Sequence, residues 1–388
     1  MYKVLFIMYK VFILLLFFLT SLYGGWAEKT LSELSIQEKI GQLIVVPACP
    51  LHESDTLRMT LQRYHIGGIL VKQGHPLQQI PFLNTLQSEA KIPLLCTGDA
   101  EWGLGMRMED TLSFPKNGIL GLHPEKIEEI GVWIGKQCHQ VGIHLNFAPV
   151  VDVNNNPDNP VIGTRSFGAD PEAVASCSAS MIKGMHKGGV LTCAKHFPGH
   201  GDTDVDSHKG LPRIPHSRDH LEKIEFVPFR RAIDSGVDAI MTGHLMLPAL
   251  DPEFPATLSI PIVTDLLQKE WGFQGLVVTD ALNMKALSEH YSTGEIAVKA
   301  LLAGHDLLLY GAHRYYDVHV ILSELIPRVV EALMQVPEEV LDPHVLKVLQ
   351  AKEKLGLHKN RVTELSENLM GELHHSDAIT LIDSMSHD

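Results

Sequence analysis

Eight short apolar runs, spaced fairly regularly along the chain, constrain its fold more than any other feature. Each run is continuous rather than alternating in hydrophobicity, which is typical of a strand buried on both faces of a parallel sheet. The runs are residues 43–46, 68–71, 94–96, 144–148, 190–194, 239–241, 276–278 and 307–309. Helical patterns lie between them, for example at 124–141, 171–187, 218–234 and 281–303. Eight strand–helix units predict an α/β fold of the (β/α)8 TIM type.

The length is compatible with a single barrel. The 388 residues would suffice for about two or three average domains, but α/β barrels often exceed roughly 250 residues as one unit. An open doubly wound sheet is disfavoured because no G-x-G-x-x-G pattern opens a helix after a strand. We therefore expect one barrel domain at residues 28–360 and a C-terminal tail at 361–388.

Residues 1–27 have the pattern of a secretory signal peptide. Lys3 and Lys10 accompany an apolar run, and the small residues Gly25 and Ala27 follow it. An uncleaved membrane anchor is the alternative, because the apolar stretch approaches the roughly 20 residues that span a bilayer. We predict cleavage near Ala27 and a periplasmic or extracellular location, with membrane attachment only if the segment is retained.

Composition excludes several classes of partner. The net charge of -14, from 32 Lys+Arg and 46 Asp+Glu, disfavours non-specific binding to nucleic acid. The 5 cysteines are scattered and form no CxxC pair, so neither a disulfide framework nor a cysteine zinc site is expected. They are expected to be buried thiols, with one optional bridge in an exported protein. Nothing in the sequence indicates the oligomeric state.

Charged and polar residues follow most of the predicted strands. In a (β/α)8 barrel the C-terminal ends of the strands form the rim that carries active sites. The residues in these positions are Asp99, Glu101, Asn146, Asp152, Lys195, His196, His244 and Asp280. Some could have structural roles: Lys195 in an ion pair at a strand end, Asp280 as the cap of a helix beginning at Ala281, and the nearby Arg165 bound to Asp170. Together the rim residues predict a functional site.

Residues 195–208, KHFPGHGDTDVDSH, are the densest part of this set. A calcium loop is rejected because Ser207 stands at the sixth position, where glycine is required, and Arg213 stands at the twelfth, where glutamate is required. A dyad is the preferred interpretation, in which Asp206 orients His208 and raises the basicity of its imidazole. Such a histidine can protonate a leaving group.

A transition-metal site is an open alternative for the same segment. Its ligands would be His196, His200, Asp206 and His208. Barrel metallohydrolases usually collect ligands from several strands, and no His-x-His pair follows the first strand. We therefore assign no metal and no other cofactor, whereas the metal alternative predicts that a chelator abolishes activity.

The segment resembles the signature of family 3 glycoside hydrolases, in their N-acetyl-β-glucosaminidase (β-N-acetylhexosaminidase) branch. Three further motifs occur in the family's order: NFAPVVDVNNNPDNPVIGTRSFGADP at 146–171, MTGHLMLPALD at 241–251 and GFQGLVVTDALNM at 272–284. The resemblance covers most of residues 31–357. It implies a barrel enzyme that hydrolyses terminal β-linked N-acetylglucosamine with retention of configuration. It also implies a saccharide substrate drawn from peptidoglycan fragments.

The resemblance implies roles for individual residues. Asp280 matches the nucleophile that forms a covalent glycosyl-enzyme, and His208 with Asp206 matches the acid/base dyad. This dyad departs from the two carboxylates that most glycosidases use. The residues that match sugar ligands or accompany them at the pocket are Asp99, Arg107, Arg165, Lys195, His196 and His244.

Two features depart from the family pattern. Trp102 stands where a glycine is common, which would change how the far edge of the sugar or the pocket mouth is recognised. The tail at 366–388 weakly resembles the first strand of the second domain of longer relatives, and we interpret it as a remnant or a packing extension.

Other activities are alternatives to hydrolysis of N-acetylglucosaminides. A phosphorylase is one, because a neutral histidine repels incoming phosphate less than a glutamate would. Another β-glycosidase of the same family is a second, and an inactive sugar-binding relative is a more distant third. The joint presence of Asp280, His208 and Asp206 argues against the inactive relative.

Overall fold

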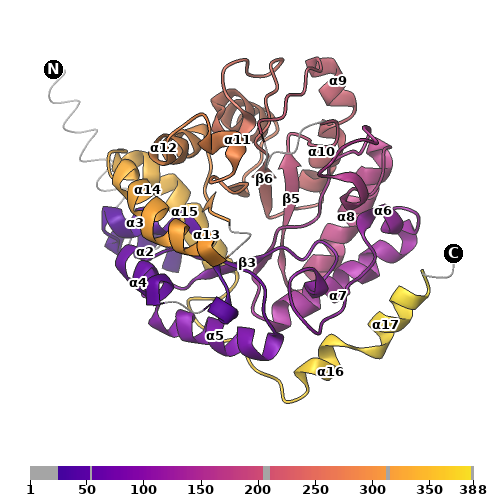
Figure 1. Ribbon diagram of the computed structural model, residues 1–388, viewed down its shortest axis with the longest axis horizontal. Helices are drawn as coiled ribbons and strands as arrows, with labels where there is room; N and C mark the ends of the chain where they lie inside the picture. Colours follow the sequence, from indigo (N-terminus) through magenta and orange to yellow (C-terminus); the bar gives the residue numbers. More distant parts are fainter. Residues whose placement is uncertain (1–24, 53–54, 204–209, 312–314, 386–388) are drawn as a thin grey trace.

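Eight parallel strands form the centre of the molecule in the computed structural model (Figure 1). They pair in the order β7-β6-β5-β4-β3-β2-β1-β8, and a bridge between Val278 and Leu307 joins β7 to β8, so the sheet closes into the predicted barrel. The strands are β1 Ile44–Ala48, β2 Gly68–Val71, β3 Leu95–Gly98, β4 Leu145–Asn146, β5 Leu191–Phe197, β6 Ala239–Thr242, β7 Leu276–Thr279 and β8 Leu308–Leu309. Every strand residue is buried, as continuous apolar runs predict.

The structure describes residues 25–52, 55–203, 210–311 and 315–385. Asp206, His208 and residues 1–24 of the predicted signal segment therefore lie outside the described residues. None of the described helices is long and apolar enough to cross a membrane.

Helices surround the strands (Figure 1). The α-helices are α2 Trp26–Glu33, α3 Ile36–Gln42, α4 Asp55–Tyr64, α5 Pro76–Glu89, α6 Asn117–Leu120, α7 Ile127–Gln140, α8 Pro171–Gly188, α9 Arg218–Lys223, α10 Phe226–Asp234, α11 Lys285–Ser288, α12 Thr293–Ala303, α13 Tyr315–Val320, α14 Ile326–Leu333, α15 Glu338–Lys354, α16 Leu369–Leu373 and α17 Ser376–Asp383. Two π-helical stretches, η6 Pro261–Glu270 and η7 Ile321–Leu325, complete the ring. Short 3-10 turns are η1 Pro50–His52, η2 Leu104–Met106, η3 Pro124–Lys126, η4 Gly163–Arg165 and η5 Ala256–Leu258.

Two helices that the sequence predicts as continuous are each interrupted. The predicted helix at 218–234 divides into α9 and α10, which keeps Pro228 within the first turn of α10, where its missing N–H costs no helical hydrogen bond. The predicted helix at 281–303 is irregular up to α11, and α12 begins only after Ser292. Ser292 forms a capping box with Glu295, a local signal that starts a new helix.

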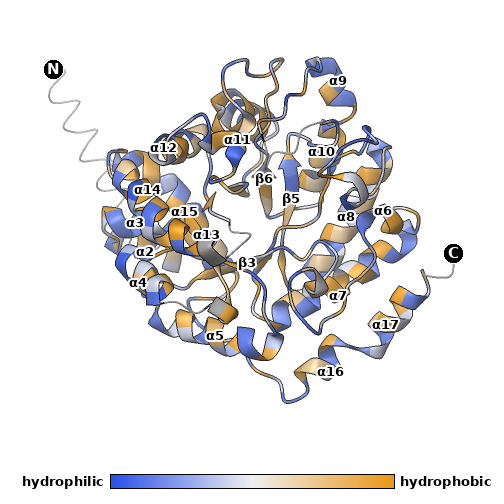
Figure 2. Ribbon diagram, in the orientation of Figure 1, coloured by the Kyte–Doolittle hydropathy of each residue, from blue (hydrophilic) through white to orange (hydrophobic). Residues whose placement is uncertain are grey.

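The core consists of apolar side chains of the strands and of the helix faces turned toward them (Figure 2). The helices α7 and α8 approach each other closely because glycines line their contact. A Cβ atom on Gly135 of α7 would lie 2.5 Å from the carbonyl oxygen of Met185, and one on Gly188 of α8 would lie 2.6 Å from the Cα of Gly135. All five cysteines are buried and unbridged, which confirms the predicted buried thiols.

The first described residues pack directly on the barrel. Trp26 and Ala27 begin α2, Ala27 is fully buried, and the Trp26 N–H donates to Glu353 Oε1 at 2.6 Å. Removal of the chain up to Ala27 would therefore shorten α2 by its first two residues. The signal segment and its cleavage near Ala27 remain predictions.

The C-terminal tail, which we interpret from the sequence as a remnant or a packing extension, is helical. It forms α16 and α17, which run along the outside of the barrel beside α7 (Figure 1). Gln137 of α7 donates to the carbonyl of Leu373 at 2.9 Å, and the ring centroids of Trp133 and His375 lie 4.9 Å apart.

Candidate active site

A cavity of about 500 Å³ opens at the C-terminal ends of the barrel strands, as the fold predicts. It is lined by six of the residues that the sequence predicts for the site, namely Asp99, Arg107, Arg165, Lys195, His196 and Asp280. Asp99 directly follows β3 and Asp280 directly follows β7, whereas Lys195 and His196 lie near the C-terminal end of β5. The C-terminal ends of strands that are distant in the sequence therefore place these side chains around the same cavity.

An ion-pair network forms one wall of the cavity. Lys195 Nζ lies 3.0 Å from Asp99 Oδ1 and 2.8 Å from Glu101 Oε1. Arg165 binds Glu101 through two hydrogen bonds, of 2.9 Å from Nε and 2.7 Å from a terminal nitrogen, and Arg107 donates to Asp99 at 3.0 Å. Lys195 thus forms the strand-end ion pair named above while also lining the cavity.

The network keeps its carboxylates ionised. Burial is the largest single influence and would raise the pKa of Asp99 and of Glu101, but the positive charges around them, Lys195 foremost, together outweigh it and hold the pKa of both carboxyls well below the usual range. Arg107 acts in the same direction on Asp99, and Arg165 on Glu101. Because the charges are fixed before a ligand arrives, the hydrogen-bonding groups need little reorganisation when it binds.

The partners of Arg165 differ from Asp170, the partner that the sequence suggested. Its guanidinium pairs with Glu101, whereas Asp170 caps α8 by accepting from the N–H of Ala173 at 2.8 Å. The backbone carbonyl of Arg165 also accepts from Asn117 at 2.7 Å. An anchoring pair between Arg165 and Asp170 is therefore wrong, and the side chain of Arg165 belongs to the cavity wall.

Asp152 fixes the two histidines at the end of β5. Its fully buried carboxylate accepts from the backbone N–H of His196 at 3.1 Å and of His200 at 2.8 Å, and it lies 2.8 Å from His196 Nδ1. Contact through Nδ1 leaves Nε2 of His196 as the nitrogen available to a ligand. His200 lies 2.9 Å from Thr203 through its own Nδ1, and burial lowers the pKa of His200 to about 4.

Asp280 is held mainly through the backbone. Its N–H donates to the carbonyl of Thr242 at 3.0 Å, and its Oδ1 accepts from the N–H of Ala281 at 2.7 Å. The next helix, α11, begins only at Lys285, so Asp280 does not cap a helix beginning at Ala281. Burial would raise the pKa of Asp280, but His244, His196, the hydrogen bond from Ala281 and the charge of Lys195 together outweigh it and leave the pKa lowered. The carboxylate is therefore ionised and borders the cavity.

Comparison with known proteins agrees with this geometry. Residues 35–351 match the glycosyl hydrolase family 3 N-terminal domain. The chain belongs to glycosyl hydrolase family 3. It is 38% identical over 276 residues to beta-hexosaminidase A of Pseudoalteromonas piscicida, covering 64% of this chain but only 46% of that protein. It is 30% identical to beta-hexosaminidase LpqI of Mycobacterium tuberculosis, covering 82% of this chain and 83% of that protein.

A solved structure from family 3 has the same fold as this chain. A family 3 beta-N-acetylglucosaminidase from Paenibacillus sp. str. FPU-7 superposes with a TM-score of 0.82 and 38% identity, covering 91% of this chain and 68% of that one. The resemblance to family 3 and the predicted barrel are therefore confirmed.

His244 has a supporting position in this family 3 barrel. It is buried and is not among the residues that line the cavity. Its Nδ1 lies 2.8 Å from Thr257 Oγ1, and its Nε2 lies 2.9 Å from the carbonyl oxygen of Ala281. His244 therefore positions the peptide that follows Asp280.

One lining residue, Lys72, was missed from the sequence, and two residues, Glu101 and Asp152, were predicted at the rim without individual roles. Lys72 directly follows β2 and lines the cavity, and burial lowers its pKa despite the nearby charge of Asp99. Its position after an apolar run is the signal that would have identified it. Glu101 and Asp152 were noted after strands, but their partners lie on other strands, which only the folded barrel brings close.

Trp102, the departure from the family pattern, forms part of the cavity wall. The Nζ atom of Lys116 lies 5.1 Å from the centroid of its ring, a cation–π contact that holds the indole in place.

The open metal alternative concerns His196 and His200, whose Nδ1 atoms contact Asp152 and Thr203. The other two ligands of that alternative, Asp206 and His208, lie outside the described residues, so it stays a hypothesis.

Proposed function

We propose that this chain is a retaining exo-β-N-acetylglucosaminidase that removes terminal β-linked N-acetylglucosamine from a saccharide. The observation that supports it most is one cavity that holds the ionised Asp280 together with Asp99, Lys195 and His196. The cavity volume of about 500 Å³ is typical of small-molecule sites. Relatives over most of the chain are named beta-hexosaminidases.

The proposed reaction has two displacements. Asp280 attacks the anomeric carbon and forms a glycosyl ester while the bond to the leaving oxygen breaks, and His208 donates a proton to that oxygen. His208 then removes a proton from water, which attacks the anomeric carbon and releases Asp280. Asp206 orients His208 in both steps. These two assignments rest on the family resemblance.

The ion-pair wall provides the recognition. Asp99 is partly exposed to the cavity, and we propose that it accepts hydrogen bonds from the sugar hydroxyls, with Arg107 and Lys195 as donors beside it. Arg165 and His196 complete the contacts to the sugar. Because each group is already held by a partner, the sugar meets an ordered site rather than ordering it, which lowers the entropic cost of binding.

Export and a peptidoglycan substrate are finer parts of the proposal. The charged and apolar pattern of residues 1–27 supports export to the periplasm or beyond, where cell-wall fragments are available. The peptidoglycan assignment rests on the resemblance to the N-acetylglucosaminidase branch.

Assays with the purified protein test the activity. We expect it to cleave p-nitrophenyl N-acetyl-β-glucosaminide faster than the β-glucoside, to release the β-anomer first by NMR, and to proceed at the same rate without phosphate. First release of the α-anomer would contradict the two-step mechanism, and a requirement for phosphate would indicate the phosphorylase. Cleavage of N-acetylglucosaminyl-muramic acid fragments in preference to chitobiose would support the wall substrate, and the reverse would contradict it.

The acid/base assignment has its own test. The His208→Ala variant should retain most of its activity on substrates with good leaving groups and lose roughly 10²–10⁴-fold on poor ones. His290→Ala, which removes an exposed histidine, is the matched control. Equal loss on both kinds of substrate would contradict a role for His208 in protonating the leaving group.

A further inference from the structure

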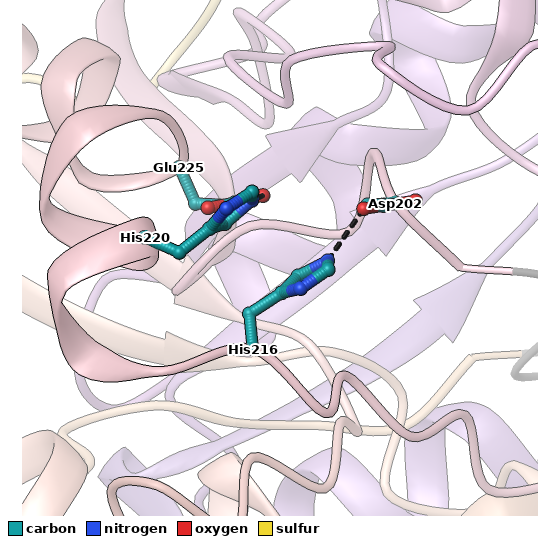
Figure 3. Close-up of side chains that lie close together, drawn as sticks. All are labelled: Asp202, His216, His220 and Glu225. Carbon is teal, nitrogen blue, oxygen red and sulfur yellow. Dashed lines mark hydrogen bonds and ion pairs between the residues drawn. The ribbon is translucent and has the colours of Figure 1, made fainter.

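A second group of histidines and carboxylates lies near the cavity but does not line it. The group consists of Asp202, His216, His220 and Glu225 (Figure 3). Each residue offers one atom that can bind a metal, a ring nitrogen or a carboxylate oxygen, and these four atoms all lie within 4.8 Å of one another. Asp202 follows β5, whereas the other three come from α9 and its two ends. His216 lies two residues before the start of α9 and His220 lies within it, and the extended backbone at Ser217 separates the two. We call these four residues the α9 cluster.

The α9 cluster contains buried polar atoms that lack a partner. His216 Nε2 lies 2.5 Å from Asp202 Oδ2, and the rings of His216 and His220 stack with centroids 4.0 Å apart. Within the described part of the chain, however, His220 Nε2 and Glu225 Oε2 are both buried without a hydrogen bond. Buried polar atoms normally have partners, and an unpaired one is costly. A bound cation would satisfy both atoms.

Glu225 is the most enclosed member of the α9 cluster. It is 1% exposed, and Asn155 donates to its Oε1 at 3.4 Å. A Cβ atom on Gly199 would lie 2.7 Å from Glu225 Cβ, so the carboxylate sits against the turn that follows β5. Figure 3 shows its carboxylate beside the ring of His220, and Nε2 of that ring lies 3.8 Å from Oε1. A carboxylate is rarely buried to this extent without a positive partner.

We propose that the α9 cluster binds one Zn²⁺ ion. Two imidazole nitrogens and two carboxylate oxygens supply the four nitrogen and oxygen ligands that a tetrahedral zinc site uses, whereas Ca²⁺ and Mg²⁺ prefer sites made entirely of oxygen. Ligand atoms of tetrahedral zinc lie about 3.3 Å apart. Atoms within 4.8 Å therefore need to shift by only about 1 Å.

The zinc ion would have a structural role and does not depend on the proposed glycosidase activity. It would join the residues after β5 to both ends of α9 and so fix Asp202 and His216, which flank residues 203–215 in the sequence. The predicted acid/base pair, Asp206 and His208, belongs to that stretch.

Zinc binding to the metal-stripped full-length protein tests the proposal, with a chromophoric chelator as competitor and metal analysis after dialysis. We expect one equivalent of zinc to be retained and the melting temperature to rise with zinc. His220→Ala and Glu225→Gln should each weaken zinc binding by at least about 10-fold. His186→Ala is the matched control, because it removes a histidine that pairs with the single carboxylate of Asp238 at 2.6 Å outside the cluster.

Four outcomes would overturn the proposal. They are the absence of retained zinc, unchanged affinity in both cluster variants, displacement of zinc by millimolar Ca²⁺ or Mg²⁺, and loss of zinc in His196→Ala, which would place the ion in the cavity. Because Glu225 is buried, Glu225→Gln could unfold the protein. The side chain of His220 is 36% exposed, so His220→Ala provides a variant that keeps the fold.

Discussion

Asp99 and Asp280 are two carboxylates of one cavity in very different surroundings. Each follows a barrel strand, β3 for Asp99 and β7 for Asp280, and each is partly exposed to the cavity. Asp99 binds Lys195 and Arg107 at 3.0 Å each. Among the described residues, the carboxylate of Asp280 has a hydrogen bond only from the N–H of Ala281.

The difference in partners suits the two carboxylates to different tasks, substrate binding for Asp99 and bond formation for Asp280. A carboxylate that is paired with two cations has low basicity and is a poor nucleophile, but it is a well-oriented acceptor for hydroxyl groups. A carboxylate with a single backbone partner keeps lone pairs available for attack on carbon. The surroundings therefore support the roles proposed above, recognition for Asp99 and bond formation for Asp280.

Replacing Asp280 with asparagine should have the largest effect. Asp280→Asn keeps the shape and the acceptor for Ala281, but an amide cannot form the glycosyl ester. We expect kcat/KM to fall by at least about 10³-fold with little change in melting temperature. Steady-state kinetics on aryl N-acetyl-β-glucosaminide measures this. A variant that retained a tenth of the activity would show that Asp280 is not the nucleophile.

Replacing Asp99 should have the second largest effect, and it should act on binding. Asp99→Asn removes a charged acceptor, whose hydrogen bonds are worth about 1.5–3 kcal/mol. That corresponds to a loss of roughly 10–100-fold in kcat/KM, carried mostly by KM. A fall in kcat at unchanged KM would reverse the division of roles between Asp99 and Asp280.

Replacing Asp152 should have a smaller effect, because Asp152 acts through His196. Asp152→Asn keeps an acceptor for the backbone N–H groups but loses the charge beside His196 Nδ1. We expect kcat/KM to fall by about 10-fold, as for loss of one hydrogen bond to a charged group. Asp251→Asn is the matched control. Its buried carboxylate accepts from Ser259 at 2.6 Å outside the cavity and should affect stability alone.

The sequence predicted the barrel more completely than the site. The eight strands were predictable because a strand buried on both faces needs a continuous apolar run, a property of neighbouring residues. The interruptions at Pro228 and Ser292 were missed because the helical periodicity continues across them. Glu101 and Asp152 had no predicted partners, since the ion pairs join strands that are distant in sequence. The α9 cluster was missed for the same reason, because Asp202 and α9 meet only in the fold.

The smallest expected effect is on the pH dependence of stability, and it tests directly whether cations stabilise the charge of Asp99. The pKa of Asp99 is lowered in the folded chain, against about 3.9 when unfolded, so its ion pairs stabilise the fold fully above about pH 4. This contribution begins to decrease below about pH 4 and is fully lost only when the pH falls through the lowered pKa of the folded state. Between pH 6 and pH 3 the parent should therefore lose more stability than Asp99→Asn, by about 1–2 kcal/mol. Urea unfolding at each pH measures this difference. Parallel losses in the two proteins would mean that the cations do not stabilise the charge of Asp99, and the contrast with Asp280 would then lose its electrostatic basis.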